Sequence, residues 1–326
     1  MAGKPKPGFF IVVALVVIGL VGVALWRTGI LAPEGKKSSV AGGNITKDDL
    51  KNAQGGSAAG GAEAPDNQAP TTVKEYSFVA AEKLPPIKGA AAYEPMKDNT
   101  VRFALNVWAG WAPIIFANDG LKPGKIWKTP DGKEFKLDLV LIDDPVAMRD
   151  AYATGKIHIG WATLDMVPLF MEELSKDSRT APRIFQQVDW SNGGDGIVGR
   201  GIESINQLRG KTVALAQNSP SEFFLLNALI NAGIQPSEVK YKYTADAFQA
   251  AAAFNSDKSI SACVSWAPDI YNLSKVKGNK LLVSTVTANK LIADVWFARA
   301  DFAKDHKDIL EGIVRGIFDS MDELQS

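Results

Sequence analysis

Aromatic and polar side chains recur together in this sequence at the points where short apolar runs end. Aromatic rings exclude water from a pocket, while a few polar groups fix the orientation of a bound molecule. Rings can also hold an amine or another cationic group through cation–π attraction. We therefore predict a pocket for a small polar molecule, formed by Trp108, Trp111, Trp161, Thr163, Asp165, Asp189, Trp190, Ser191, Asn192, Asp195, Gln217, Ser219, Ser221, Trp266 and Asp269.

Each of these residue types also has an ordinary structural role, and the sequence leaves the alternatives open. A single Trp is equally suited to core packing, and Asp165 and Asp195 are equally suited to capping turns. The segment from Ser219 to Glu222 has the spacing of a capping box at a helix start. Its free N–H groups would suit an oxyanion, but Glu222 could close the cap itself.

The same residues give little support for catalysis or metal binding. The chain has one cysteine, Cys263, and two histidines far apart in sequence, His158 and His306. It contains no nucleophile elbow, zinc-protease motif, phosphate-binding loop or dinucleotide fingerprint. Its 36 basic and 36 acidic side chains balance, whereas nucleic-acid-binding proteins carry a basic excess. We expect no enzyme, no metal, no cofactor and no nucleic-acid partner.

The elements that position these side chains follow an alternation of strands and helices from residue 100 onward. Apolar runs such as 101–109, 157–162 and 212–216 predict strands, and the segments between them predict helices. Asp144, Pro145 and Gly155 have the types expected for the N-cap, first position and end of one helix. This pattern predicts an α/β fold with a mainly parallel sheet, in which ligands bind beyond the carboxyl ends of the strands.

The stretch 186–201 interrupts a strand pattern with polar side chains and two adjacent glycines. We interpret it as a binding loop followed directly by a strand that crosses from one lobe to the other. Gly193 and Gly194 would allow the backbone to approach a ligand closely.

The N-terminal third differs in composition from the rest. Phe9 to Trp26 is 18 residues without a charge, nearly enough for a helix to span a bilayer of about 30 Å. We expect residues 1–31 to be an uncleaved transmembrane signal anchor, with a cleaved signal peptide as the alternative. Residues 32–99 are rich in Gly, Ala and Pro and predict a flexible, disordered linker.

Four segments in succession resemble a known family: AMRDAYATGKIHIGWA, VDWSNGGDGIVGR, SINQLRGKTVALAQNSPSEFFLLNAL and SWAPD. Their order is similar to that in the solute-binding proteins of ABC importers for nitrate, sulfonates, taurine and thiamine precursors. The resemblance covers about residues 100–326 and implies a two-lobed, type II periplasmic-binding-protein-like fold that closes on a small molecule. Lobe 1 would comprise residues 100–199 and 294–326, and lobe 2 residues 200–293. Relatives continue with further helices, so lobe 1 is expected to be incomplete at its carboxyl end.

The function that follows is capture of a small polar organic molecule for an ABC importer, without bond chemistry. The molecule would be sulfonate- or taurine-like, an amine, or thiamine-precursor-like. The expected partners are this solute, the ABC permease and ATPase complex, and the membrane through the N-terminal helix. We expect a monomer on the inner (cytoplasmic) membrane with its body in the periplasm or on the extracytoplasmic face. The alternative is a tethered sensing or envelope scaffold module fused to a downstream domain.

Overall fold

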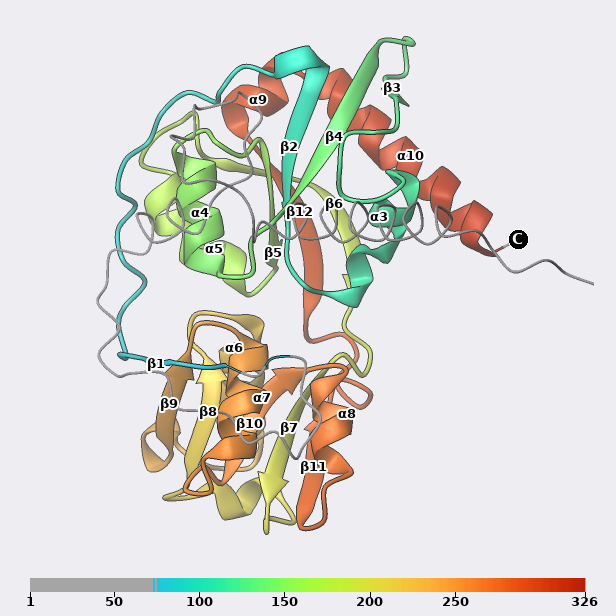
Figure 1. Cartoon of the computed structure of the whole chain (residues 1–326). Helices are drawn as coiled ribbons and strands as arrows, with labels where there is room; N and C mark the ends of the chain where they lie inside the picture. Colours follow the sequence, from blue (N-terminus) through green and yellow to red (C-terminus); the bar gives the residue numbers. More distant parts are fainter. Residues whose placement is uncertain (1–72, 74, 326) are drawn as a thin grey trace, which may run out of the picture. The chain divides into compact units, whose positions relative to one another are not determined.

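The computed structural model describes residue 73 and residues 75–325, which form two α/β lobes. Each lobe is built on a six-stranded sheet (Figure 1). The predicted anchor, residues 1–31, and most of the predicted linker lie outside the described residues. Within the described part, no helix has the length and apolar character needed to cross a bilayer.

The sheet of lobe 1 has the strand order β3-β4-β2-β5-β12-β6. Strands β4, β2 and β5 are parallel, whereas β12 is antiparallel to both of its neighbours. The strands are β2 (Thr100–Leu105), β3 (Trp127–Lys128), β4 (Glu134–Leu141), β5 (Ile159–Thr163), β6 (Pro182–Trp190) and β12 (Ala293–Arg299). The helices are α3 (Ala112–Ala117), α4 (Pro145–Ala153), α5 (Met166–Leu174), α9 (Ala300–Asp305) and α10 (Lys307–Gln325).

The sheet of lobe 2 repeats this plan with the order β1-β9-β8-β10-β7-β11. Strands β9, β8 and β10 are parallel, and β7 is antiparallel to β10 and β11. The strands are β1 (Phe78–Val79), β7 (Asp195–Arg200), β8 (Thr212–Ala216), β9 (Lys240–Thr244), β10 (Ala262–Trp266) and β11 (Asn279–Ser284). The helices are α6 (Pro220–Asn231), α7 (Ala247–Ser256) and α8 (Asp269–Ser274).

The chain crosses twice between the two sheets, from β6 into β7 and from β11 into β12 (Figure 1). In each sheet the strand that follows a crossing is antiparallel to both of its neighbours, and the edge strands β1 and β3 are also antiparallel, so the sheets are mixed rather than mainly parallel. Strand β7 starts at Asp195 and belongs to lobe 2, so the first crossing precedes the boundary expected at residues 199 and 200. The predicted crossing strand is therefore a sheet strand of lobe 2.

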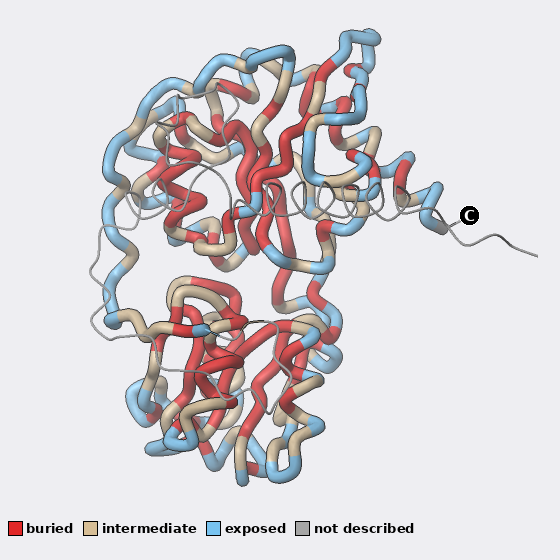
Figure 2. The backbone as a smooth tube through the Cα atoms, viewed as in Figure 1, coloured by how far each residue is buried: buried red, intermediate tan, exposed pale blue. Residues whose placement is uncertain are grey.

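Local sequence chemistry accounts for the helix boundaries. The side chain of Asp144 accepts hydrogen bonds from the backbone N–H groups of Val146 and Ala147 at the start of α4, as predicted. Gly155 ends this segment with a φ of 82°, a conformation that favours glycine. Apolar side chains on the central strands of each sheet form the cores, which Figure 2 shows as buried tube through both lobes.

Residues 75–96, which we call the strap, contact both lobes although the sequence places them in the flexible linker. The buried Tyr76 packs in a core cluster of lobe 2, and β1 pairs with the edge strand β9. The backbone N–H of Glu82 donates to the side-chain oxygen of Gln217, 3.1 Å away. Part of the predicted linker is thus structured, and residues 76–82 of it contact lobe 2.

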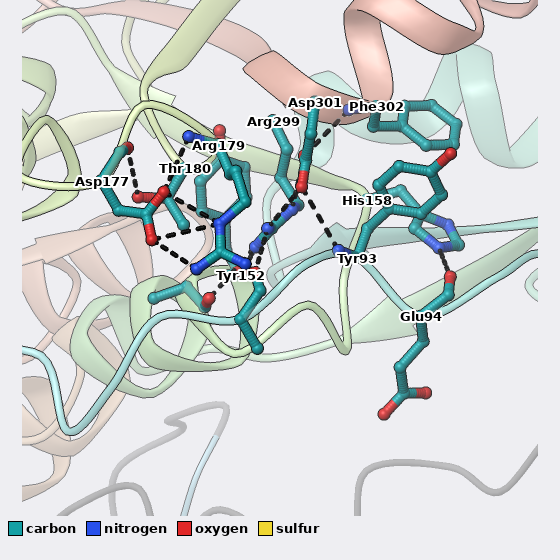
Figure 3. Close-up of polar contacts among 12 residues, drawn as sticks. Tyr93, Glu94, Tyr152, His158, Asp177, Arg179, Thr180, Arg299, Asp301 and Phe302 are labelled. Carbon is teal, nitrogen blue, oxygen red and sulfur yellow. Dashed lines mark hydrogen bonds and ion pairs between the residues drawn. The ribbon is translucent and has the colours of Figure 1, made fainter.

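The carboxyl-terminal half of the strap is fixed to lobe 1 by buried polar groups (Figure 3). The buried guanidinium of Arg299 donates to the carbonyl oxygen of Ala91 and pairs with Asp301 at 2.9 Å. His158 accepts a backbone hydrogen bond at Nδ1, so its Nε2 donates to the carbonyl oxygen of Glu94 at 2.7 Å. Burial lowers the pKa of His158 to about 4, which keeps the imidazole neutral and in this tautomer.

Candidate functional site

A cavity lies between the lobes, beyond the ends of the strands that the sequence pattern singled out. The space between its atoms is about 240 Å³, which includes open solvent. The lining residues are Asn106, Trp108, Trp161, Thr163, Asp195, Pro220, Trp266, Ile292 and Asp294.

On the lobe 1 side, strand register places three polar side chains in one row. Asp294 on β12 pairs with Thr163 on β5 and with Asp189 on β6. Residues directly opposite each other on neighbouring strands point to the same face of the sheet. The row brings the carboxyl group of Asp189 close enough to raise the pKa of Asp294.

On the lobe 2 side, Asp195 is held at the start of β7. One carboxylate oxygen, Oδ2, accepts a hydrogen bond of 2.5 Å from the hydroxyl of Ser191. The other, Oδ1, is buried and has no hydrogen-bond partner. Thr285, from the second crossing, accepts hydrogen bonds from the backbone N–H groups of Gly193 and Asp195. The two crossings are therefore bonded to each other beside the cavity.

Three indole rings complete the wall. Trp108 and Trp266 meet edge to face with centroids 6.0 Å apart, and the Nε1–H of Trp108 donates to Asp189 at 3.2 Å. Trp161 donates from Nε1 to the carbonyl oxygen of Ile142. The ring of Trp108 lies directly against Gly194, where a methyl group would fall 2.0 Å from a ring carbon. The glycine therefore makes room for a ring in the wall of the cavity.

The ionisable side chains in and beside the cavity are acidic. Burial raises the pKa of Asp195 to about 7, and the neighbouring Asp165 and Asp189 raise it further. Burial also raises the pKa of Asp294 well above its usual range, with Asp189 as the next cause. Burial raises the pKa of Asp165 as well. No Lys, Arg or His is among the lining residues given above.

Five of the predicted residues line the cavity: Trp108, Trp161, Thr163, Asp195 and Trp266. Asp189 and Ser191 contact lining residues through the hydrogen bonds described above. Asp165 precedes α5 without capping it, and its Oδ1 is buried without a partner. Asp195 lies in a strand. Capping of a turn or helix therefore accounts neither for Asp165 nor for Asp195.

The structure places three predicted residues away from the cavity wall. Trp111 is fully buried in the core of lobe 1, where it stacks on Trp296 and donates to Asn106. Trp190 is 41% exposed, because it follows Asp189 on the strand and so points to the opposite face. Asn192 is exposed in the crossing. Proximity in sequence to the cavity residues does not bring these three side chains into its wall.

The remaining predicted residues are bonded or buried within lobe 2. Gln217 binds the strap, and Ser219 caps α6 by accepting from the N–H of Ser221 at 3.2 Å. Glu222 accepts from the backbone N–H of Asn218, so the cap is closed by an acidic side chain. Ser221 is buried and its hydroxyl has no partner. The buried Asp269 begins α8.

Sequence reasoning missed four lining residues: Asn106, Pro220, Ile292 and Asp294. Asp294 carried a usable signal, since an Asp within an apolar strand such as 293–299 is unusual. Asn106 directly follows β2 and could have been found by extending the search to the strand end itself. Ile292 and Pro220 carry no chemical signal, because apolar residues in a wall look like core residues in sequence.

The nucleophilic and basic side chains of the described residues do not form a reaction centre in the cavity. The thiol of Cys263 is buried in lobe 2, and burial raises its pKa above its ordinary value. His158 is buried beneath the strap. Among the residues that the structure describes, no cluster of three His, Cys, Asp or Glu side chains is arranged to hold a metal ion. The cavity combines indole rings with a few polar side chains, as pockets for small molecules do.

Comparison with known proteins supports this interpretation. Residues 197–325 match the family model described as NMT1/THI5 like. The matched residues span most of lobe 2 together with β12, α9 and α10 of lobe 1. No curated protein matches the chain significantly in sequence.

Solved structures share the fold over about two thirds of this chain, which includes residues that precede the segment matched by the family model. The periplasmic aliphatic sulphonate-binding protein of Escherichia coli is 17% identical, with a TM-score of 0.53 over 68% of this chain and 72% of that chain. The periplasmic nitrate-binding protein of Synechocystis PCC 6803 is 12% identical, with a TM-score of 0.54 over 69% of this chain and 61% of that chain. A ligand-binding component of an ABC-type import system from Staphylococcus aureus is 16% identical, with a TM-score of 0.54 over 68% and 73%.

These similarities confirm the predicted resemblance to the solute-binding proteins of ABC importers. The chain has their two-lobed, mixed α/β, periplasmic-binding-protein-like fold, with one sheet in each lobe and two crossings.

Proposed function

We propose that the chain is an extracytoplasmic solute-binding protein that captures a small polar organic molecule between its lobes for an ABC importer. The observation that carries the proposal is the cavity, in which both lobes present buried polar atoms without partners. They are Oδ1 of Asp195 and Nε1 of Trp266 from lobe 2, and Oγ1 of Thr163 from lobe 1. Buried polar groups are normally hydrogen-bonded, so unpartnered ones around one cavity point to a ligand that bonds them.

The partners of the proposed function follow from the fold and the N-terminal sequence. Structural neighbours include binding proteins for sulphonate and nitrate, which supports a small solute and an ABC permease as partners. Phe9 to Trp26 would hold the body at the extracytoplasmic face of the inner membrane, with the following residues as a tether. The lobes would close around the solute by motion about the two crossings.

Ligand binding by the full chain in mild detergent tests this proposal. A panel of sulfonates, nitrate, amines, amino acids and aminopyrimidines is screened by tryptophan fluorescence during heating. A ligand at 100 times its dissociation constant stabilises the folded state by about 2.7 kcal/mol. For a body of this size, that corresponds to a Tm increase of roughly 5–10 °C. No increase for any compound, in protein with a cooperative transition, would contradict solute capture.

A tethered ligand-sensing module is the second candidate, and the strap favours it. The strap is bonded to β9 of lobe 2 and to Arg299 of lobe 1, so motion between the lobes would pull on the segment that leads toward the proposed anchor. Uptake of the identified ligand by cells that lack the protein separates the two candidates. An importer component is required for uptake, whereas a sensor is required only for the response to the ligand.

A further inference from the structure

The ionisable side chains that line the cavity are all acidic. Two lining side chains, Asp195 and Asp294, are carboxylic acids that are 2% and 5% exposed. Asp165 and Asp189 are close enough to raise the pKa of both. Thus four acidic groups, from β7, β12, the start of α5 and β6, act on one small space without a basic side chain among its lining residues.

The hydrogen bonds within the protein leave some polar atoms of this acidic site without a partner. Oδ1 of Asp195 has no partner, although Ser191 donates to Oδ2. The indole of Trp266 lies near enough to lower the pKa of Asp195, but its Nε1 completes no hydrogen bond. A buried carboxylate without a counter-charge is strongly unfavourable unless a donor reaches it. The donor missing here is one that a ligand would supply.

The indole rings in the cavity wall restrict the class of ligand that can bind. The faces of Trp108, Trp161 and Trp266 carry partial negative charge and attract cations. A sulfonate or nitrate group would face these rings and the carboxyl groups of Asp195 and Asp294 at once, so it would be repelled. A protonated amine has three N–H donors and a positive charge, and it can serve carboxylates and rings together.

We infer that the cavity binds a solute through a protonated amino group, held by Asp195 from lobe 2 and Asp294 from lobe 1 against the indole rings. The inference rests on the proposed function and names the solute class of the same site. The amine neutralises carboxyl groups from both lobes. The remaining lining polar groups, Asn106 and Thr163, accept or donate to the rest of the solute.

Four compounds that differ in one group at a time test the inference by calorimetric titration of the full chain at pH 8. Taurine and isethionate share a sulfonate and differ in having an ammonium or a hydroxyl group. Ethanolamine and ethylene glycol repeat this difference without the sulfonate. We expect binding of ethanolamine, with or without taurine, and at least about 10-fold weaker binding of the hydroxyl analogues, because a hydrogen bond to a charged group is lost.

Variants of Asp195 and Asp294 provide a second test of the inference. Asp294→Asn and Asp195→Asn should each weaken ethanolamine binding by about 10-fold or more, since each removes a charged partner while preserving shape. Asp319→Asn, an exposed acid on α10, is the matched control and should bind as the wild type does. Lowering the pH from 8 toward 6 should weaken binding in the wild type, because the pKa of Asp195 is about 7 and its protonation removes a charge that binds the amine. Asp165, Asp189 and Asp294 are the other acidic groups around the cavity.

The outcomes separate this inference from the proposed function. Equal binding of taurine and isethionate, without ethanolamine, would show that an anionic group is recognised and would overturn the inference while leaving solute capture intact. Binding of Ca²⁺ or Zn²⁺ in place of every amine would also overturn it, as would the absence of binding by ethanolamine and taurine alike. Failure of every compound, anions and aminopyrimidines included, would remove the proposed function as well.

Discussion

Replacing Asp195 with Asn removes a carboxyl group that folding takes out of water. Burial raises its pKa to about 7, whereas an Asp in the unfolded chain titrates near 3.8. Below about pH 4 the group is protonated in both states and does not affect stability. As the pH rises from about 4 to 7, the unfolded chain loses this proton first, so the folded state is progressively disfavoured.

The difference between the two pKa values corresponds to about 4 kcal/mol, which is an upper estimate of the stability that the wild type loses by pH 8. Asn cannot ionise, and it retains an oxygen that can accept from Ser191. We therefore expect Asp195→Asn to match the wild type near pH 4 and to exceed it at pH 8. At about 2–4 °C per kcal/mol, the Tm difference at pH 8 would be roughly 8–16 °C.

Thermal unfolding of both proteins from pH 4 to 8, without ligand, measures this difference. The pH dependence of stability in the wild type alone does not isolate Asp195, because His158 changes the stability with pH in the opposite direction. Its pKa of about 4 in the folded state lies below the ordinary value, so its contribution is lost as the pH falls from about 6.5 to 4. The variant retains His158, and the subtraction isolates Asp195. A difference that stays constant between pH 4 and 8 would refute the electrostatic account of the cavity, and Asp319→Asn should show no such pH-dependent difference.

Three further predictions concern the residues that shape the site and hold the strap. Gly194→Ala would place a methyl group 2.0 Å from the ring of Trp108, so we expect the ring to be displaced. Ligand affinity measured by calorimetry should then fall by more than about 10-fold. Unchanged affinity would mean that Trp108 is not part of the site. Arg299→Met leaves buried carbonyl oxygens and Asp301 without their donor, and we expect a loss of about 3–5 kcal/mol in urea unfolding, with Arg299→Lys intermediate. By NMR, His158 should keep its proton on Nε2 and remain neutral from pH 8 to 5, and a titration midpoint near 6.5 would contradict its burial.

The sequence predicted those parts of the fold that depend on local chemistry. The helix that follows Asp144 and the helix that follows Ser219 both start where their caps predicted. The alternation of apolar runs predicted two α/β lobes and a return of the chain to the first lobe. The antiparallel strands after each crossing were not predicted, because strand direction depends on how the lobes are connected and leaves no local pattern in the residues.

The site was predicted in part for a similar reason. Thr163 and Trp266 were found because they end strands whose carboxyl ends lie at the cavity, and Trp161 lies two residues before the end of β5. Trp190 was included for its position beside Asp189, but alternation along β6 points the two side chains to opposite faces. Asp294 was missed because its place in the site depends on register with two strands that lie more than a hundred residues earlier. Register of this kind is a tertiary property.

The position of the two cavity acids suggests how binding and closure are linked. Asp195 begins the strand that follows the first crossing, and Asp294 lies at the start of the strand that follows the second. Each crossing thus delivers one acid, and the two belong to sheets of different lobes. Asp195 raises the pKa of Asp294, so bringing the lobes together without a ligand confines acidic groups in a desolvated space. A ligand shifts a conformational equilibrium only by binding one state more tightly. A cation between these acids binds the closed state more tightly, because only that state offers both carboxyl groups at once, and it removes the repulsion that opposes closure.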